Sequence, residues 1–84
     1  MNPTVEVVAV LDGAKLLLRF SNGEERVFDV APYLCKGIFG ELSDPAYFEL
    51  VTAHERHVAW PHGQDFSHDT LYLRSVPADS LRAA

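Results

Sequence analysis

The sequence contains a single cysteine, Cys35, so no disulfide bond can form within the chain. It also lacks a basic segment, because its seven lysines and arginines are spread from Lys15 to Arg82 among twelve acidic residues. A net charge of −5 repels the phosphate backbone of nucleic acids, so we expect no direct contact with DNA or RNA. Acidity of this kind suits solubility and a basic partner.

Long apolar segments are missing as well. The purely apolar stretches extend over only a few residues, whereas a membrane-spanning helix needs about 20. The N-terminal residues lack the basic and apolar regions of a signal peptide. We therefore expect a cytoplasmic protein that does not contact a membrane.

What is present is the composition of one folded domain. Hydrophobic residues make up 48% of the 84 residues and charged residues 23%, which are ordinary values for a globular protein. A chain of this length has room for one core. We predict a single α+β domain over residues 1–76, followed by a frayed C-terminal tail over residues 77–84.

Two adjacent strands are predicted at the N-terminus. Residues 5–11 are rich in β-branched side chains, and residues 15–20 place alternate apolar side chains on one face. Asp12-Gly13 between them favours a two-residue type I′ turn. This turn predicts three apolar cross-strand pairs: Ala9–Leu16, Val7–Leu18 and Val5–Phe20.

A third strand over residues 26–30 follows the turn at Asn22-Gly23. A two-residue loop there would carry Asp29 onto the core face, because a slip of one residue inverts every side chain. We therefore predict a three-residue loop, with the glycine in the left-handed conformation. The resulting apolar pairs are Leu18–Phe28 and Leu16–Val30.

Two short helices are predicted from their starting residues. Asp44 suits the N-cap and Pro45 the first position of a helix that turns Phe48 inward. Ser67 is expected to cap a last helix that begins near His68.

A second hairpin is predicted from residues 51–53 and 58–60, with Glu55-Arg56 near its turn. The predicted fold class is therefore α+β. It consists of an antiparallel sheet, made of the N-terminal three-stranded meander plus the second hairpin, together with two short helices.

The outer face of the meander is predicted to carry an apolar cluster of Val8, Leu17 and Val27. A solvated sheet face normally alternates to polar residues, so something should cover this cluster. Either the last helix packs over it, or it is a protein-binding patch. The predicted rim of this patch is charged and consists of Glu6, Arg19 and Asp29. Glu6 and Arg19 would form a cross-strand pair.

The histidines and the cysteine have simple structural explanations. His54 and His57 flank a predicted turn, but no cysteine joins them as a zinc ligand. We predict no metal and no cofactor. Cys35 follows apolar residues and is expected to be a buried structural thiol.

A hydrolytic alternative rests on His62, Asp65 and Ser67, which have the residue types of a catalytic triad. Known triads gather these types from separate elements around a pocket, whereas here they lie within six consecutive residues. We therefore expect Asp65 and Ser67 to hold a turn and cap a helix, and we predict that the protein is not an enzyme. A small hydrolase using these three residues is the alternative.

An ordered series of short phrases extends from Val5 to Tyr72. They are Leu16-x-Leu18-x-Phe20, Asn22-Gly23-Glu24, Phe28-Asp29-Val30, Gly37-x-Phe39-x-x-Leu42-x-Asp44, Phe48, Val58-Ala59-Trp60, Gly63-x-Asp65-Phe66 and Asp69-x-Leu71-Tyr72. Taken together, the series resembles the small bacterial α+β family catalogued as domain of unknown function 2442.

This resemblance implies a protein with no established catalytic activity and no catalytic residues to transfer. Members of the family are often encoded beside another small protein, in an arrangement that resembles toxin–antitoxin pairs. Some relatives carry a helix-turn-helix domain after this one, for which a chain ending at Ala84 has no room.

We therefore expect a non-enzymatic protein-binding module that binds a small co-encoded protein. It would be the antitoxin-like or regulatory half of a two-gene unit. A regulatory domain that acts on DNA only through a partner is a further alternative, and a homodimer is an alternative association.

Overall fold

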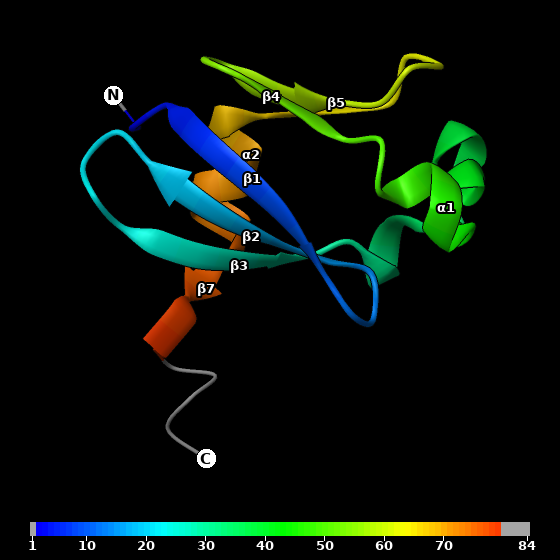
Figure 1. The fold of residues 1–84 in the computed structure, drawn as a ribbon, viewed down its shortest axis with the longest axis horizontal. Helices are drawn as coiled ribbons and strands as arrows, with labels where there is room; N and C mark the ends of the chain where they lie inside the picture. The colour runs from blue at the N-terminus through cyan, green and yellow to red at the C-terminus, as the bar shows by residue number, and fades with distance from the viewer. Residues whose placement is uncertain (1, 80–84) are drawn as a thin grey trace.

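The computed structural model describes residues 2–79 and contains two antiparallel sheets with short helices (Figure 1). The strands are β1 (Val5–Leu11), β2 (Lys15–Phe20), β3 (Glu25–Asp29), β4 (Thr52–His54), β5 (His57–Ala59), β6 (Asp65–Ser67) and β7 (Val76–Pro77). The helices are two 3₁₀ segments, η1 (Ala31–Tyr33) and η2 (Gly37–Ser43), and two α-helices, α1 (Pro45–Phe48) and α2 (His68–Arg74). The first sheet has the strand order β1-β2-β3-β7 and the second β4-β5-β6, which confirms the predicted α+β class.

Strands β6 and β7 were not predicted from the sequence. Each has only two or three residues, too few to produce a recognisable alternation in the sequence. Strand β7 pairs Val76 with Val27 and Pro77 with Arg26, so the predicted tail begins inside the first sheet. Tail residues 80–84 lie outside the described residues.

The turn between β1 and β2 has three residues rather than the predicted two. It spans residues 12–14, and both Gly13 and Ala14 have positive φ, of 80° and 60°. The longer turn shifts the register, so the predicted pairs Ala9–Leu16 and Val7–Leu18 are wrong. The observed pairs are Val8–Leu18, Ala9–Leu17 and Val10–Leu16. Val5 does face Phe20, as predicted, because an irregularity between Val5 and Val7 absorbs one residue.

The turn between β2 and β3 has the predicted three-residue loop with Gly23 at a φ of 88°. Its position differs from the prediction by one residue, because the Phe20 N–H donates to the Glu24 carbonyl at 2.9 Å. The pairs Leu18–Phe28 and Leu16–Val30 are therefore wrong, and Leu16 faces Phe28 instead. A register shift of two residues preserves the face, so the same apolar side chains still point inward.

One core joins both sheets and the two α-helices. Phe28 of the first sheet meets Phe66 of the second, with ring centroids 5.0 Å apart. Helix α2 lies behind β1 and β2 in Figure 1, and its Leu71 is fully buried. The fully buried apolar side chains are Leu16, Leu18, Phe20, Phe28, Val30, Leu42, Val58 and Leu71.

Both predicted helix caps are confirmed. The Asp44 carboxylate accepts a hydrogen bond from the Ala46 N–H at 3.1 Å, and Pro45 occupies the first turn of α1. The Ser67 hydroxyl accepts a hydrogen bond from the Thr70 N–H at 3.2 Å at the start of α2. Each cap satisfies a backbone donor that has no partner inside the helix.

Candidate functional site

The outer face of the first sheet carries an apolar row that differs from the predicted patch by one residue. This outer-face row consists of Ala9, Leu17, Val27 and Val76, which face one another across the four strands. Val8 pairs with Leu18 and packs against the core, so its predicted place beside Leu17 is wrong. The three-residue turn is the cause, because one extra residue inverts the side chains of β1 relative to β2.

Charged pairs flank the outer-face row on both sides. Across β2 and β3, Arg19 faces Glu25 on one side of the row, and Lys15 faces Asp29 on the other. The predicted Glu6–Arg19 pair is wrong, because Val7 occupies the position opposite Arg19. Two of the three predicted rim residues, Arg19 and Asp29, therefore border the row.

Helix α2 packs on the opposite face of this sheet. The Tyr72 ring meets the Phe20 ring edge-on, with centroids 5.2 Å apart, on the core side. The last helix therefore does not cover the outer-face row, because α2 lies behind β1 and β2 in Figure 1, on the core side of the sheet. Exposure is uneven along the row: Ala9 is exposed, Leu17 is half-buried, Val27 is buried and Val76 is 43% exposed.

The three residues of the hydrolytic alternative do not assemble. His62 Nδ1 lies 2.6 Å from Glu41 Oε2, and the His62 ring stacks on Tyr47. The Ser67 hydroxyl is used in the α2 cap, and the Asp65 side chain is exposed at the start of β6. Within residues 2–79, no hydrogen bond joins any two of His62, Asp65 and Ser67.

A buried glutamine organises the surroundings of His62. Gln64 is 1% exposed; its Oε1 accepts from the Tyr47 hydroxyl at 2.6 Å, and its Nε2 donates to Ile38 O at 3.0 Å and Glu41 Oε1 at 2.9 Å. The pKa of the Glu41 carboxyl is lowered, mainly by the hydrogen bond from Gln64 and to a smaller extent by the contact with His62. Burial acts in the opposite direction and raises this pKa. We call these five residues the Gln64 cluster. It holds η2 and α1 against the β5–β6 loop.

A second polar cluster joins the β2–β3 loop to the end of α2. The Tyr72 hydroxyl donates to Glu24 Oε2 at 2.5 Å, and Arg26 Nη1 lies 3.3 Å from Glu24 Oε1. Arg26 Nη2 also donates to the Ser75 carbonyl at 2.7 Å. The Tyr72 hydrogen bond, followed by one from Asn22, lowers the pKa of Glu24, and the same Tyr72–Glu24 bond raises the pKa of Tyr72. These interactions hold the β2–β3 loop against the end of α2.

The remaining candidate ligands lie apart. His54 and His57 form a cross-strand pair whose rings stack with centroids 4.6 Å apart. In the part of the chain that the structure describes, no three histidine, cysteine, aspartate or glutamate side chains are placed to hold a metal ion. Cys35 is exposed, so its predicted burial is wrong. It lies in the turn between η1 and η2, outside the packed elements.

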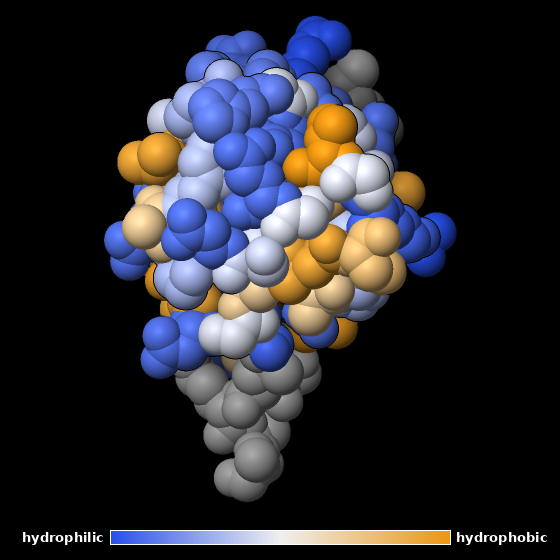
Figure 2. Space-filling model, turned by 90° about the vertical axis from the view of Figure 1, so that its right-hand side faces the viewer, coloured by the Kyte–Doolittle hydropathy of each residue, from blue (hydrophilic) through white to orange (hydrophobic). Residues whose placement is uncertain are grey.

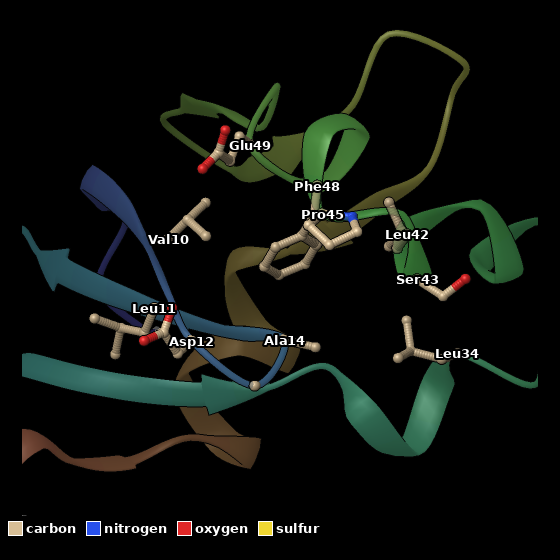
Figure 3. A pocket seen from close by; sticks show the side chains of 11 residues that line it. Val10, Leu11, Asp12, Ala14, Leu34, Leu42, Ser43, Pro45, Phe48 and Glu49 are labelled. Carbon is tan, nitrogen blue, oxygen red and sulfur yellow. The ribbon is translucent and has the colours of Figure 1, made fainter.

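An open pocket of about 260 Å³ lies between the β1–β2 turn and the segment formed by η2 and α1. Figure 3 shows Val10 on one side of this space and Phe48 projecting into it from α1. Asp12 and Glu49 supply its carboxylates, and neither makes a side-chain hydrogen bond or ion pair with another residue in the range 2–79. The apolar lining side chains are Val10, Leu11, Ala14, Leu34, Leu42, Pro45 and Phe48.

The side of the molecule that carries α1 and η2 combines polar and apolar surface. Figure 2 shows hydrophilic residues over most of its upper half and apolar residues gathered below them. Ile38 of η2 is one of the large apolar side chains exposed to solvent.

Two small antiparallel sheets, short helices and one shared core define a small α+β domain. The chain belongs to the family described as protein of unknown function (DUF2442), whose family model matches residues 5–77. The match extends from the first residue of β1 to the last residue of β7 and confirms the resemblance seen in the sequence. Searches of curated proteins and of solved structures each give no match. No helix within residues 2–79 is long and apolar enough to cross a membrane.

Proposed function

We propose that this protein is a non-enzymatic binding module that holds a small partner protein against the outer-face row. The observation that carries the proposal is an apolar row across four strands, flanked by charged pairs and left uncovered by helix α2. An apolar centre with a polar rim is the usual anatomy of a protein interface. Leu17 lies inside the row, and we propose it as the main contact residue.

The proposed partner is the product of the neighbouring gene, and this chain would act as the antitoxin-like or regulatory half of the pair in a bacterial cytoplasm. The gene arrangement of the DUF2442 family supports this choice. The acidic chain, with twelve acidic and seven basic residues, favours a partner with a basic binding surface.

The structural roles of the polar side chains support a non-enzymatic function. His62 and Glu41 belong to the Gln64 cluster, and Ser67 caps α2. A catalytic nucleophile instead needs an adjacent base and a third group that orients the base.

The test uses the full chain and the protein encoded by the adjacent gene. We expect Leu17→Asp to weaken their complex at least about 30-fold, which corresponds to the roughly 2 kcal/mol typical of a buried interface anchor. Leu73→Asp is the matched control, because Leu73 is 68% exposed on α2, away from the outer face. Calorimetric titration measures both affinities, and circular dichroism establishes that both variants are folded.

Equal affinity of the folded Leu17→Asp variant and the wild type would show that the partner uses another surface. Loss of binding in both variants would show that the effect of the introduced charge is not specific to the outer-face row.

A further inference from the structure

Strand β1 lies at the edge of the first sheet, since its only hydrogen-bonded strand partner within the described residues is β2; β4 packs beside it without forming a ladder. At the N-terminal end of β1 the edge is already hydrogen-bonded, because the Val5 N–H donates to the Glu55 carbonyl of the β4–β5 turn at 3.1 Å. The C-terminal end of β1, at Val10 and Leu11, borders the pocket between the β1–β2 turn and α1. An open edge beside an apolar pocket is the arrangement used when an extended peptide adds a strand to a sheet.

The backbone of Val10 points outward at this edge. The N–H of Phe20 donates to Glu24 of the neighbouring strand, so the backbone polar groups of Phe20 point toward β3. Such groups alternate sides along a strand, so those of Leu17 point toward β1 and meet those of Ala9. The N–H and carbonyl of the next residue, Val10, then point away from β2. Within residues 2–79, no backbone hydrogen bond from another segment reaches them.

A residue that pairs with Val10 would place its side chain in the pocket. Directly opposed residues in an antiparallel pair project to the same face, and the Val10 side chain lines the pocket. The volume of about 260 Å³ lies below the roughly 300–1,000 Å³ of sites for drug-sized ligands. It suits a single apolar side chain, which Phe48, Leu42 and Leu34 would surround (Figure 3).

The charges around the pocket indicate what should flank that side chain. Asp12 and Glu49 line it, and no lysine or arginine of residues 2–79 does. Both residues are exposed, and neither carboxylate has a side-chain partner among the described residues. A lysine or arginine beside the apolar anchor would therefore gain attraction here, whereas an acidic residue would be repelled.

We propose that the edge of β1 at Val10 and the adjoining pocket bind an extended basic segment of a partner protein. The segment adds to β1 through the Val10 backbone, inserts one apolar side chain beside Phe48, and sets cationic side chains near Asp12 and Glu49. This site is separate from the outer-face row, so it does not depend on the proposed role of Leu17.

The experiment titrates the ¹⁵N-labelled full chain with a capped peptide of sequence Thr-Arg-Val-Leu-Val-Arg-Thr. We expect the amide signals of Val10, Asp12 and Phe48 to shift, and the Val10 amide to become protected from hydrogen exchange. A probe with alanine in place of leucine tests the pocket, and a probe with glutamate in place of arginine tests the charge. Both should bind more weakly.

Variants separate the two parts of the site. Val10→Pro removes an N–H that faces away from β2 and should abolish binding. The double variant Asp12→Asn and Glu49→Gln keeps the edge intact and should raise the Kd about three- to tenfold, as expected for two exposed ion pairs. Leu17→Asp should bind the peptide like the wild type, which distinguishes this site from the outer-face row.

Three results would overturn the proposal. The first is binding that shifts other signals and leaves Val10 unchanged. The second is equal affinity for the arginine and glutamate probes. The third is a Val10 signal that moves on dilution of the chain alone, which would assign the edge to a second copy of this protein.

Discussion

Replacing Gln64 by leucine tests whether the Gln64 cluster stabilises the fold. The side chain is 1% exposed and makes three hydrogen bonds, to Tyr47, Ile38 and Glu41. Each such bond contributes a net of about 0.5–1.5 kcal/mol, and the bond to the half-exposed Glu41 lies at the lower end. Leucine has a similar volume, so little is added for a cavity. We expect the free energy of unfolding to fall by about 2–3 kcal/mol.

Urea unfolding at neutral pH measures this loss. Trp60 is the single tryptophan and is buried, so its fluorescence should report the transition. The Tyr47→Phe variant completes a double-mutant cycle. Because the Tyr47 hydroxyl donates to Gln64, we expect the two losses to be non-additive by about 1 kcal/mol.

The same variant should change the response to acid. Gln64 is the main reason for the lowered pKa of Glu41. A carboxyl with a lowered pKa adds stability above its ordinary value of 4.5, and this contribution is lost as the pH falls through the lowered pKa. The stability difference between wild type and variant should therefore narrow in acid. A loss below about 0.5 kcal/mol at neutral pH, or strict additivity with Tyr47→Phe, would refute the assigned role of Gln64.

Three further predictions concern other parts of the chain. Asp44→Ala removes the α1 cap and should lower the melting temperature by about 4–8 °C, measured by circular dichroism; an unchanged melting temperature would show that the cap contributes little. Cys35 should react with iodoacetamide in the folded protein, as followed by mass spectrometry, whereas a requirement for denaturant would contradict its exposure. Glu24 has a lowered pKa, so wild-type stability should fall below pH 4.5 more steeply than that of Glu24→Gln, as shown by urea unfolding at several pH values.

Local features of the sequence predicted the secondary structure well. Asp44 with Pro45, and Ser67 before His68, mark helix starts through interactions within a few residues, so their caps follow from the sequence. The alternation of residues 15–20 identified the buried face of β2, since a strand buries every second side chain.

The composition of the candidate site depended on details that local pattern does not determine. Whether β1 and β2 are joined by two or three residues decides if Val8 or Ala9 lies beside Leu17. Asp12-Gly13 favours the shorter turn. In the observed turn Ala14 also has a positive φ, and because alanine rarely adopts this conformation, the sequence gives no reason to predict it.

Alternation and capping act between neighbours along the chain, so the sequence alone was enough to predict strands β1 to β5, both α-helices and the apolar face of β2. Strands β6 and β7, and the pairs of residues that meet across the sheets, follow only from tertiary packing. The Gln64 hydrogen bonds join residues that are 17 to 26 positions apart in the sequence. Strand β7 pairs with β3, from which it is separated by about fifty residues. Such contacts form because packing brings distant groups together in one core, and no local preference encodes their partners.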